Sequence, residues 1–409
     1  MEALIFTNNL ARVALTRLLA TMSSAAYLGP LSPLALTEIP DPTLPRQDWV
    51  TLRTSLCGLC GSDYKQVFLN GSVNNPMTAL VSFPQVLGHE VVGVVESVGP
   101  AVTTRRVGER VVLNPWLSCA PRGISPLCDW CKHGDYAQCA NFTSGCLTPG
   151  IHHGNSSMAT GGFATLLPAH ESQCLPVPDA IDSETAVLAD PFSVSLHAIL
   201  RTPPPDSGTA VVYGCGTLGL CAIAILQALF PSVRIFAVAR FEHQTQLALK
   251  LGAAEVLAWR PTEEIIRRLA ELTGAGVLVP WYGQPMLNGG VDVIYDSVAS
   301  AESLEVGVRV TTTRGAIVAT GVEIPRKFEW TPLYFKEIRL VGSNAFGIEE
   351  HDGRRQHAME WYFELVQSTN IDVTPIITHR FPLREYRKAF LACRDQGRSG
   401  AVKVLFDFR

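Results

Sequence analysis

The sequence predicts an α/β fold in which a mainly-β region precedes a doubly wound domain built on a parallel sheet. Short strand-like runs broken by Pro and Gly fill the first part of the chain. From Thr209 onward, apolar strand-like runs alternate with helix-like runs, which is the pattern of a doubly wound domain. The length of 409 residues is enough for two domains of ordinary size.

Composition narrows the classes of function. Hydrophobic residues make up 47% of the chain and charged residues 17%, so a packed globular core is expected. The net charge is −4 and no basic block is present, which argues against nucleic acid as a partner. No window reaches about 18 consecutive apolar residues, which argues against a membrane span.

The 11 cysteines follow no convincing secretory signal, so reduced thiols and metal ligands are expected, in a cytoplasmic protein. Arg12 and Arg17 give the first 30 residues a weak likeness to a targeting peptide. However, residues 1–6 are typical of a first strand, and residues 1–56 as a whole are interpreted as short strands broken by Pro.

His89 lies between two strand-like runs, where rigid backbone can hold its ring as metal ligation needs. Cys60 lies upstream and Asp190 downstream, and the hypothesis is that the three hold one zinc ion. The Cys57–Cys60 spacing also permits a redox pair, but the strand–helix setting of such a motif is missing. Cys57 is therefore interpreted as a core thiol. The alternative for Asp190 is a helix cap.

Residues 114–147 form a cysteine-rich lobe. Cys128, Cys131 and Cys139 have a spacing close to that of structural zinc sites, where tetrahedral zinc takes four thiolates. Cys119, separated from Cys128 by eight residues, is the favoured fourth ligand, and Cys146 is its competitor. The alternative is a set of buried reduced thiols.

A glycine fingerprint follows the strand-like run at 209–213. Gly214, Gly216 and Gly219 have the GxGxxG spacing, and an apolar helix-like run and a second strand-like run (233–239) come next. This context favours a dinucleotide lying on the helix N-terminus. The contacts are expected from Gly214, Gly216, Thr217, Leu218 and Gly219.

The end of the second strand-like run discriminates between the two nicotinamide cofactors. An acidic residue there would bind the ribose 2′-hydroxyl of NAD, but the chain has Ala239 followed by Arg240. A guanidinium binds a 2′-phosphate, so NADP is preferred over NAD. Glu242 and His243 leave the alternative open.

Several residues receive structural interpretations. The paired His152 and His153 stand in a Gly/Ser/Thr-rich loop and are interpreted as solvated, and His197 as a packed helix residue. The segment 275–289 is expected to be an extra loop. The last 65 residues predict helices at about 354–368 and 383–396 and a last strand at 402–406.

The order of these motifs resembles the zinc-dependent medium-chain dehydrogenase/reductase family. The matching pieces are Cys60-Gly-Ser-Asp63, Gly88-His-Glu90-x-x-Gly93, the cysteine lobe, the glycine fingerprint and Gly289-Gly-Val-Asp-Val293. The resemblance implies a GroES-like, mainly-β catalytic domain formed by both ends of the chain (1–190 and 344–409). A Rossmann cofactor domain (191–343) would be inserted between its two parts.

The resemblance also implies roles for single residues. Cys60 and His89 would be catalytic zinc ligands, and the third ligand falls on Asp190, as in threonine and polyol dehydrogenases. Glu90 fits the family's nearby acid or alternate ligand, Ser62 its hydroxyl proton relay, and Lys403 a position near the pyrophosphate. The lobe departs from the family because Ser125 stands where its first cysteine would fall.

The expected activity is hydride transfer between NAD(P)(H) and a small alcohol or carbonyl compound, with zinc polarising the oxygen. Relatives form dimers and tetramers, so a homo-oligomer is expected. Two alternatives stay open. One is a zinc-free double-bond reductase of the same superfamily, and the other is a non-catalytic protein that keeps the fold and the cofactor.

Overall fold

The computed structural model describes residues 1–72, 74–321, 323, 327–369 and 371–409. Two compact units account for them: unit 1 is Met1–Asp190 with Ile377–Arg409, and unit 2 is Pro191–Ile376. The chain re-enters unit 1 at Ile377, whereas the sequence placed this boundary at 344. Residues 344–376 pack within unit 2, where the rings of Tyr362 and Phe192 lie 4.6 Å apart.

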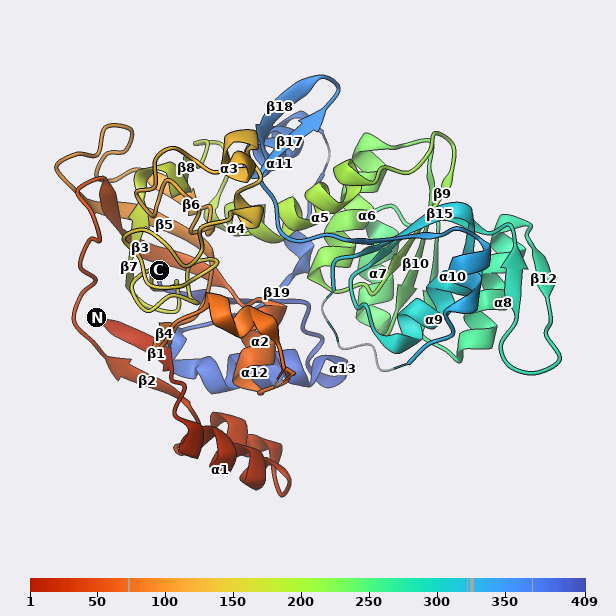
Figure 1. Ribbon diagram of the computed structural model, residues 1–409, viewed down its shortest axis with the longest axis horizontal. Helices are drawn as coiled ribbons and strands as arrows, with labels where there is room; N and C mark the ends of the chain where they lie inside the picture. The colour runs from red at the N-terminus through yellow and green to blue at the C-terminus, as the bar shows by residue number, and fades with distance from the viewer. Residues whose placement is uncertain (73, 322, 324–326, 370) are drawn as a thin grey trace. The chain divides into compact units, whose positions relative to one another are not determined.

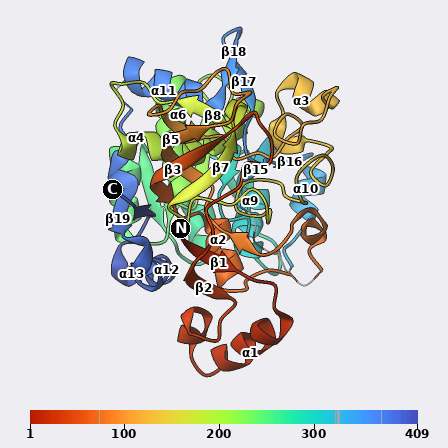
Figure 2. The same cartoon turned by 90° about the vertical axis from the view of Figure 1, so that its left-hand side faces the viewer.

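Unit 1 is built mainly from two β-sheets, as the sequence predicts. The smaller sheet has the order β2-β1-β4, and the larger has the order β19-β20-β3-β5-β6-β8 with β7 also paired to β3. Figure 2 shows β3, β5 and β7 side by side. The strands are β1 (Glu2–Phe6), β2 (Leu34–Glu38), β3 (Trp49–Gly58), β4 (Gln85–Val86), β5 (Glu90–Val98), β6 (Arg110–Leu113), β7 (Leu166–His170), β8 (Cys174–Pro176), β19 (Ile377–Phe381) and β20 (Lys403–Asp407).

Short helices connect these strands. They are α2 (Gly61–Val67), α3 (Asp129–His133), α4 (Ser183–Val187), α12 (Tyr386–Arg394), α13 (Gln396–Ser399) and the 3-10 turns η1 (Ser24–Leu28), η2 (Pro76–Leu80), η3 (Tyr136–Gln138), η4 (Glu171–Gln173) and η6 (Leu383–Glu385). Helix α5 (Ala189–Arg201) begins with the last two residues of the first segment of unit 1, Met1–Asp190, and continues into unit 2.

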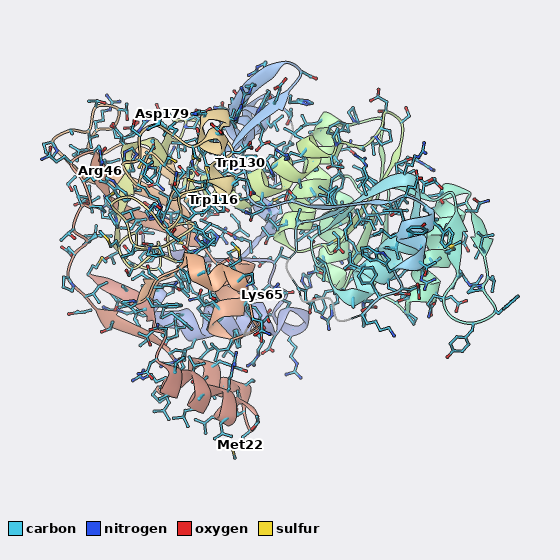
Figure 3. All side chains as sticks on the ribbon, in the orientation of Figure 1. Met22, Arg46, Lys65, Trp116, Trp130 and Asp179 are labelled. Carbon is cyan, nitrogen blue, oxygen red and sulfur yellow. The ribbon has the colours of Figure 1, made fainter. Side chains whose placement is uncertain are left out.

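One helix in unit 1 contradicts the sequence analysis, which expected only strands in residues 1–56. Helix α1 (Leu10–Ala20) is capped by the Asn9 side chain, which accepts a hydrogen bond from the N–H of Arg12 at 3.1 Å. Eleven residues without Gly or Pro after an Asn are a helix signal that the strand interpretation overlooked. The helix extends away from the sheets of unit 1 (Figures 1 and 2), and Met22 lies at its far end (Figure 3).

Unit 2 contains the predicted doubly wound sheet. Its six strands are parallel neighbours in the order β11-β10-β9-β14-β15-β16, which is the 3-2-1-4-5-6 order of dinucleotide-binding folds. The strands are β9 (Thr209–Tyr213), β10 (Arg234–Ala239), β11 (Glu255–Ala258), β14 (Val291–Asp296), β15 (Thr311–Ala319) and β16 (Arg339–Gly342).

Helices pack around this sheet (Figure 1). They are α6 (Thr217–Leu229), α7 (Glu242–Lys250), α8 (Thr262–Thr273), α9 (Ala301–Val310) and α10 (Thr331–Phe335). Unit 2 also contains α11 (Ala358–Ser368), which contacts β18, and the 3-10 turn η5 (Thr374–Ile376). Ligands of such folds bind beyond the carboxyl ends of the strands, where the strand order reverses. In unit 2 the reversal lies between β9 and β14.

Unit 2 contains two antiparallel hairpins in places where the sequence predicted a loop and the start of a helix. The segment expected to be a loop at 275–289 contains β12 (Gly276–Leu278) paired with β13 (Met286–Asn288). Strands β17 (Ile348–His351) and β18 (Arg354–His357) form the second hairpin, so α11 begins four residues later than predicted.

Candidate metal centre and cofactor site

Cys60 and His89 are held by the carboxylate of Asp63. Cys60 precedes α2, and its N–H donates to Asp63 Oδ2 at 3.0 Å, while the N–H of Gly88 donates to Oδ1 at 3.3 Å. Gly88 has φ +89°, and a Cβ there would overlap the Phe163 ring, so the turn before His89 requires glycine. One buried carboxylate thus links the two segments that carry the predicted ligands.

The structure brings three side chains together: Cys60, His89 and Glu90. The sequence predicted this for Cys60 and His89. One ligand atom from each lies within 4.8 Å of the others. Asp190, the predicted third ligand, is outside this group of three. Its carboxyl is buried in the same region, 6% exposed, and interacts electrostatically with His89 and Glu90.

The charges in this cluster are unbalanced. When ionised, Cys60, Asp63, Glu90 and Asp190 carry four negative charges, and Lys403 supplies one positive charge. Burial raises the pKa of Asp190 to about 7, and Glu90 adds to the rise. Burial lowers the pKa of His89, but Cys60 and the nearby carboxylates raise it further, to well above its usual value.

Two buried atoms of the cluster make no hydrogen bond in the described part of the chain: His89 Nδ1 and Asp190 Oδ2. An unpartnered buried polar atom is costly, and an excess of buried negative charge is more so. A divalent cation would relieve both, and a thiolate, an imidazole and a carboxylate suit zinc. The residues present therefore fit a zinc ion.

Lys403 lies beside the candidate metal centre. Its ammonium is ion-paired with Glu90, and the two side chains are 2% and 3% exposed. Gly58 in β3 leaves room for the pair, because a Cβ there would overlap Glu90 Oε2 and approach Lys403. The structure thus gives Lys403 a partner beside the metal centre, and its contact with the pyrophosphate stays a prediction.

Ser62 lies in α2, two residues after Cys60, with an exposed side chain. This position allows contact with a ligand in solution. Its role as a proton relay stays a prediction.

The cysteine lobe brings four thiols together: Cys119, Cys128, Cys131 and Cys139 all lie within 4.8 Å of one another. The sulfur of Cys139 is 3.6 Å from that of Cys119 and 4.0 Å from that of Cys128. Cys146 is exposed, and its thiol faces the carbonyl of Pro121. The geometry therefore favours Cys119 as the fourth ligand.

Hydrogen-bond donors face part of this sulfur cluster, although burial raises the pKa of Cys119 and a hydrogen bond with Cys139 raises that of Cys131. Asn141 donates to Cys119 Sγ at 3.2 Å from its side chain and to Cys139 Sγ at 3.4 Å from its backbone. Burial raises the pKa of Cys128, but the N–H groups of Ala140 and Cys131 outweigh it and bring the pKa to about 7. All cysteines in the described residues are free thiols.

Arg122, which the sequence analysis did not single out, supports the loop between the lobe and His152. Its guanidinium is buried and donates to the carbonyls of Leu117, Ser144, Leu147, Thr148 and Gly150. Burial lowers its pKa to about 10. No sequence motif marks such a residue, since all its partners are backbone carbonyls.

The prediction that the paired histidines are solvated is wrong for His153, and His152 is only partly exposed. His153 is fully buried, and its ring contacts Thr160 O at 3.0 Å and Gln173 Oε1 at 3.2 Å. The ring of His152 lies 4.5 Å from that of His89, and burial lowers its pKa to about 3. The polar sequence around the pair concealed this, because loop backbone rather than apolar side chains covers the rings.

His197 is packed inside unit 2 as predicted, and its Nδ1 lies 2.7 Å from Glu349 Oε1.

The glycine fingerprint has the geometry of a dinucleotide turn. Gly214 has φ +91°, and a Cβ on Gly219 would overlap the carbonyl of Gly214, so both positions require glycine. A Cβ on Gly216 would meet no protein atom within 4 Å. The open space in front of Gly216 and the N-terminus of α6, which includes Thr217 and Leu218, fit a pyrophosphate.

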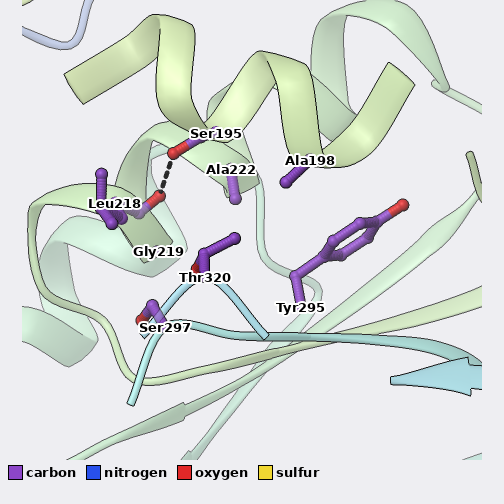
Figure 4. Close-up of a pocket in the computed structure, with 8 residues that line it drawn as sticks. All are labelled: Ser195, Ala198, Leu218, Gly219, Ala222, Tyr295, Ser297 and Thr320. Atoms are coloured by element: carbon purple, nitrogen blue, oxygen red, sulfur yellow. Dashed lines mark hydrogen bonds between the residues drawn. The ribbon is translucent and has the colours of Figure 1, made fainter. Parts of the chain in front are cut away.

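A small pocket adjoins this turn between α5, α6 and the end of β14 (Figure 4). Gly219, Leu218 and Ala222 of α6 line it together with Ser297 and Thr320. The hydroxyl of Ser297 donates to Gly214 O at 2.7 Å, which fixes the two strand ends to each other.

Arg240 follows β10, as predicted, and its side chain is exposed. The guanidinium lies over the rings of Phe241 and Trp259, 5.5 Å from each centroid. The aromatic rings restrict the side chain without neutralising its charge. It is therefore available to an anionic group beyond the end of the strand.

The described residues contain no helix that is long and apolar enough to cross a membrane.

Comparisons with known proteins agree with this geometry. Residues 46–179 match the family model of the alcohol dehydrogenase GroES-like domain, and residues 217–364 match that of zinc-binding dehydrogenases. The chain is 27% identical to a (R,R)-butanediol dehydrogenase of Saccharomyces cerevisiae, covering 77% of this chain and 81% of the relative. It is also 27% identical to a sorbitol dehydrogenase of Arabidopsis thaliana, covering 94% of this chain.

Among solved structures, the fold is similar to that of 2R,3R-butanediol dehydrogenase from Bacillus subtilis, with a TM-score of 0.70 at 23% identity, covering 92% of this chain and 96% of that one. The two family matches together span more than half of the chain and include Cys60, His89 and the cysteine lobe. The chain therefore belongs to the zinc-dependent medium-chain alcohol and polyol dehydrogenase family.

Proposed function

We propose that this protein transfers a hydride between NADP(H) and a small alcohol or carbonyl compound at a zinc centre held by Cys60, His89 and Asp190. The observation that carries the proposal is the buried cluster of acidic groups around His89, in which Lys403 pairs only with Glu90 and Asp190 Oδ2 has no hydrogen-bond partner in the described part of the chain. When bound, zinc would act as a Lewis acid on the substrate oxygen and the nicotinamide would exchange the hydride.

The choice of Asp190 as the third ligand is supported by the partners of the two acids. Glu90 Oε2 is paired with Lys403, so its charge is compensated by the protein. Asp190 Oδ2 is buried without a hydrogen bond in the described part of the chain. We therefore assign Asp190 to the metal, and Glu90 to the Lys403 pair beside it.

The remaining residues bind, orient and move protons. Asp63 holds the segments of Cys60 and His89 through two backbone hydrogen bonds, so the ligands are positioned before the metal binds. Ser62, exposed next to Cys60, would take the proton of the substrate hydroxyl and pass it to solvent. In unit 2, Gly214, Gly216, Thr217, Leu218 and Gly219 would hold the pyrophosphate.

The proposed substrates carry hydroxyl groups on adjacent carbons. Relatives over much of the chain are named butanediol and sorbitol dehydrogenases. The oxygen ligand Asp190 also agrees with the polyol type of site suggested by the sequence. Both observations favour a diol or polyol over a simple alcohol.

NADP is the preferred cofactor in this proposal, because Arg240 stands where an acid would bind the 2′-hydroxyl of NAD. Lys403 would approach the pyrophosphate only if its contact with Glu90 changes. A homo-oligomer and a cytoplasmic location complete the proposal, the latter supported by the free cysteines.

A panel of alcohols and carbonyl compounds, assayed with NADP and NAD alongside zinc quantification, tests the function. We expect turnover of secondary alcohols and diols, higher kcat/KM with NADP, and two zinc ions per chain. Reduction of activated double bonds by a zinc-free preparation would instead identify the reductase alternative. Cofactor binding without turnover of any compound would favour a non-catalytic protein.

A further inference from the structure

The ring of His152 packs directly against the proposed metal centre. Its centroid lies 4.5 Å from that of His89, with 47° between the ring planes. On another side the edge of Trp116 approaches it, with centroids 5.8 Å apart and an interplanar angle of 89°. The ring of His152 is thus packed between the proposed metal ligand His89 and the ring of Trp116.

The loop that carries His152 is fixed. The backbones of Trp116 and His152 form an isolated β-bridge. The side-chain oxygen of Asn155 accepts the N–H groups of Ile151 and His152 at 2.9 and 3.1 Å. Arg122 binds the carbonyl of Gly150 just before them. The ring position therefore follows from the backbone rather than from the ring contacts alone.

One hydrogen bond fixes the tautomer of His152. Its Nδ1 lies 2.5 Å from the carbonyl oxygen of His153. A carbonyl can only accept, so Nδ1 carries the hydrogen and Nε2 of the neutral ring is an acceptor. Among the described residues, no hydrogen bond reaches Nε2, and the side chain is partly exposed.

The neighbouring His153 shows what a purely structural histidine looks like in this loop. It is fully buried, and both ring nitrogens have partners, Thr160 O and Gln173 Oε1. Nothing comparable holds Nε2 of His152 in the described residues. The difference separates a histidine that supports the loop from one that presents an acceptor next to His89.

We propose that His152 Nε2 accepts a hydrogen bond from a second hydroxyl of the substrate, on the carbon next to the one that reacts. His152 thereby selects vicinal diols and polyols over alcohols with one hydroxyl. The inference rests on the proposed function, because it needs the reacting oxygen at the centre that includes His89. An acceptor of fixed tautomer favours a hydroxyl hydrogen over an apolar carbon at that place.

His152→Phe tests this proposal, because Phe keeps an aromatic ring between His89 and Trp116 and removes the acceptor. The matched substrates are butane-2,3-diol and 2-butanol, which differ by one hydroxyl group. We expect kcat/KM for the diol to fall about tenfold, the value of one net hydrogen bond. We expect kcat/KM for 2-butanol to stay within twofold. His351→Phe, at a histidine in β17 of unit 2, is the control and should change kcat/KM for neither alcohol.

Binding supplies a readout that does not depend on turnover. Calorimetry on the zinc-loaded protein with reduced cofactor, which cannot take a further hydride, should show about tenfold weaker diol binding for His152→Phe and unchanged 2-butanol binding. Long-range ¹⁵N–¹H correlation spectra of the wild type should show the hydrogen of the His152 ring on Nδ1.

The outcomes separate the two proposals. Equal losses for both alcohols, no loss for either, or a hydrogen on Nε2 would overturn the role of His152. A wild type that binds the diol selectively but oxidises neither alcohol would refute the proposed function and leave the binding role in place. Retained zinc content in the variant excludes loss of the metal as the cause of a selective effect.

Discussion

Lys403 and Glu90 form a buried ion pair that joins β20 to β5 across 313 residues of sequence. Burial lowers the pKa of Lys403, but Glu90 and the neighbouring Cys60 raise it further, above its usual value. Lys403 therefore stays protonated, and its positive charge lies against the Glu90 carboxyl. Asp190 is left as the buried carboxyl whose Oδ2 has no hydrogen-bond partner in the described part of the chain.

The pair should be tested by breaking it. Lys403→Met leaves Glu90 buried and unpaired, so we expect a loss of about 3–5 kcal/mol in the free energy of unfolding. The double variant Lys403→Met with Glu90→Gln should recover most of this loss, because no buried charge is left alone. Urea unfolding of the single and double variants measures both. A single variant as stable as the wild type would show that the pair is not ionised.

The sequence could not reveal this contact. Lys403 begins the last strand and Glu90 the strand after His89, and β3 pairs with both, so only the sheet order brings them together. Spacing along the chain predicts ligands that share a turn, as in Cys128 and Cys131. Side chains that converge from three strands of a sheet need the register, which the sequence alone does not supply.

The structural zinc site offers a matched pair of cysteine substitutions. Cys119→Ser removes a thiol of the four-sulfur cluster, so we expect zinc content to fall from two ions per chain toward one and the lobe to lose stability. Cys146→Ser, at the exposed cysteine, should change neither. Elemental analysis and thermal unfolding of both variants check this. Zinc loss in Cys146→Ser instead would reverse the assignment.

The spacing of the cysteines in the lobe could predict zinc ligands, because three of them lie close together in the sequence. Cys128 and Cys131 flank a single turn, and Cys139 follows within the same short segment. The choice between Cys119 and Cys146 depended on the path of residues 120–127 and 140–145, for which the sequence offered no constraint. The structure fixes that path through Arg122, whose carbonyl partners Leu117 and Ser144 precede and follow the four clustered cysteines.

His357 should make unit 2 sensitive to acid. Burial lowers its pKa to about 4, against 6.5 for a free side chain, and its Nδ1 caps α11 by accepting the N–H of Met359 at 3.2 Å. The unfolded chain binds a proton at higher pH than the native one, so stability present above pH 6.5 is lost as pH falls toward 4. The free energy of unfolding is lower by about 3 kcal/mol once the pH is below both pKa values.

His357→Asn tests this linkage, because Asn keeps the N-cap but cannot titrate. Stability measured by denaturant unfolding between pH 7 and pH 4 should fall less steeply in the variant than in the wild type. His133→Asn, at an exposed histidine of α3, is the control and should follow the wild type. Identical slopes for His357→Asn and the wild type would contradict the prediction.

Arg240 should determine the choice of cofactor. Arg240→Asp replaces the guanidinium with a carboxylate that repels a 2′-phosphate and accepts a hydrogen bond from a 2′-hydroxyl. We expect kcat/KM with NADP to drop roughly tenfold or more while that with NAD rises. Steady-state kinetics with both cofactors measure the ratio. Equal or better use of NAD by the wild type would already contradict the preference.

The doubly wound unit was the most predictable part of the chain. Strands β9, β10, β14, β15 and β16 each coincide with a short apolar run in the sequence, and the glycine fingerprint marks the first crossover. The hairpins β12–β13 and β17–β18 were missed because they depart from that alternation, and helix α1 because its helix signal was read as part of a run of strands. The position of the His152 ring was unpredictable, because it depends on loop contacts with Trp116 and Asn155.

The most direct test of the zinc centre is His89→Ala, assayed for metal content, turnover and cofactor affinity together. We expect the variant to lose the metal of this centre and its turnover, to keep the zinc of the cysteine lobe, and to bind NADP with an affinity close to that of the wild type. Full turnover by His89→Ala, with one zinc ion fewer or the same number, would contradict the central claim that this imidazole holds the ion on which the reaction depends.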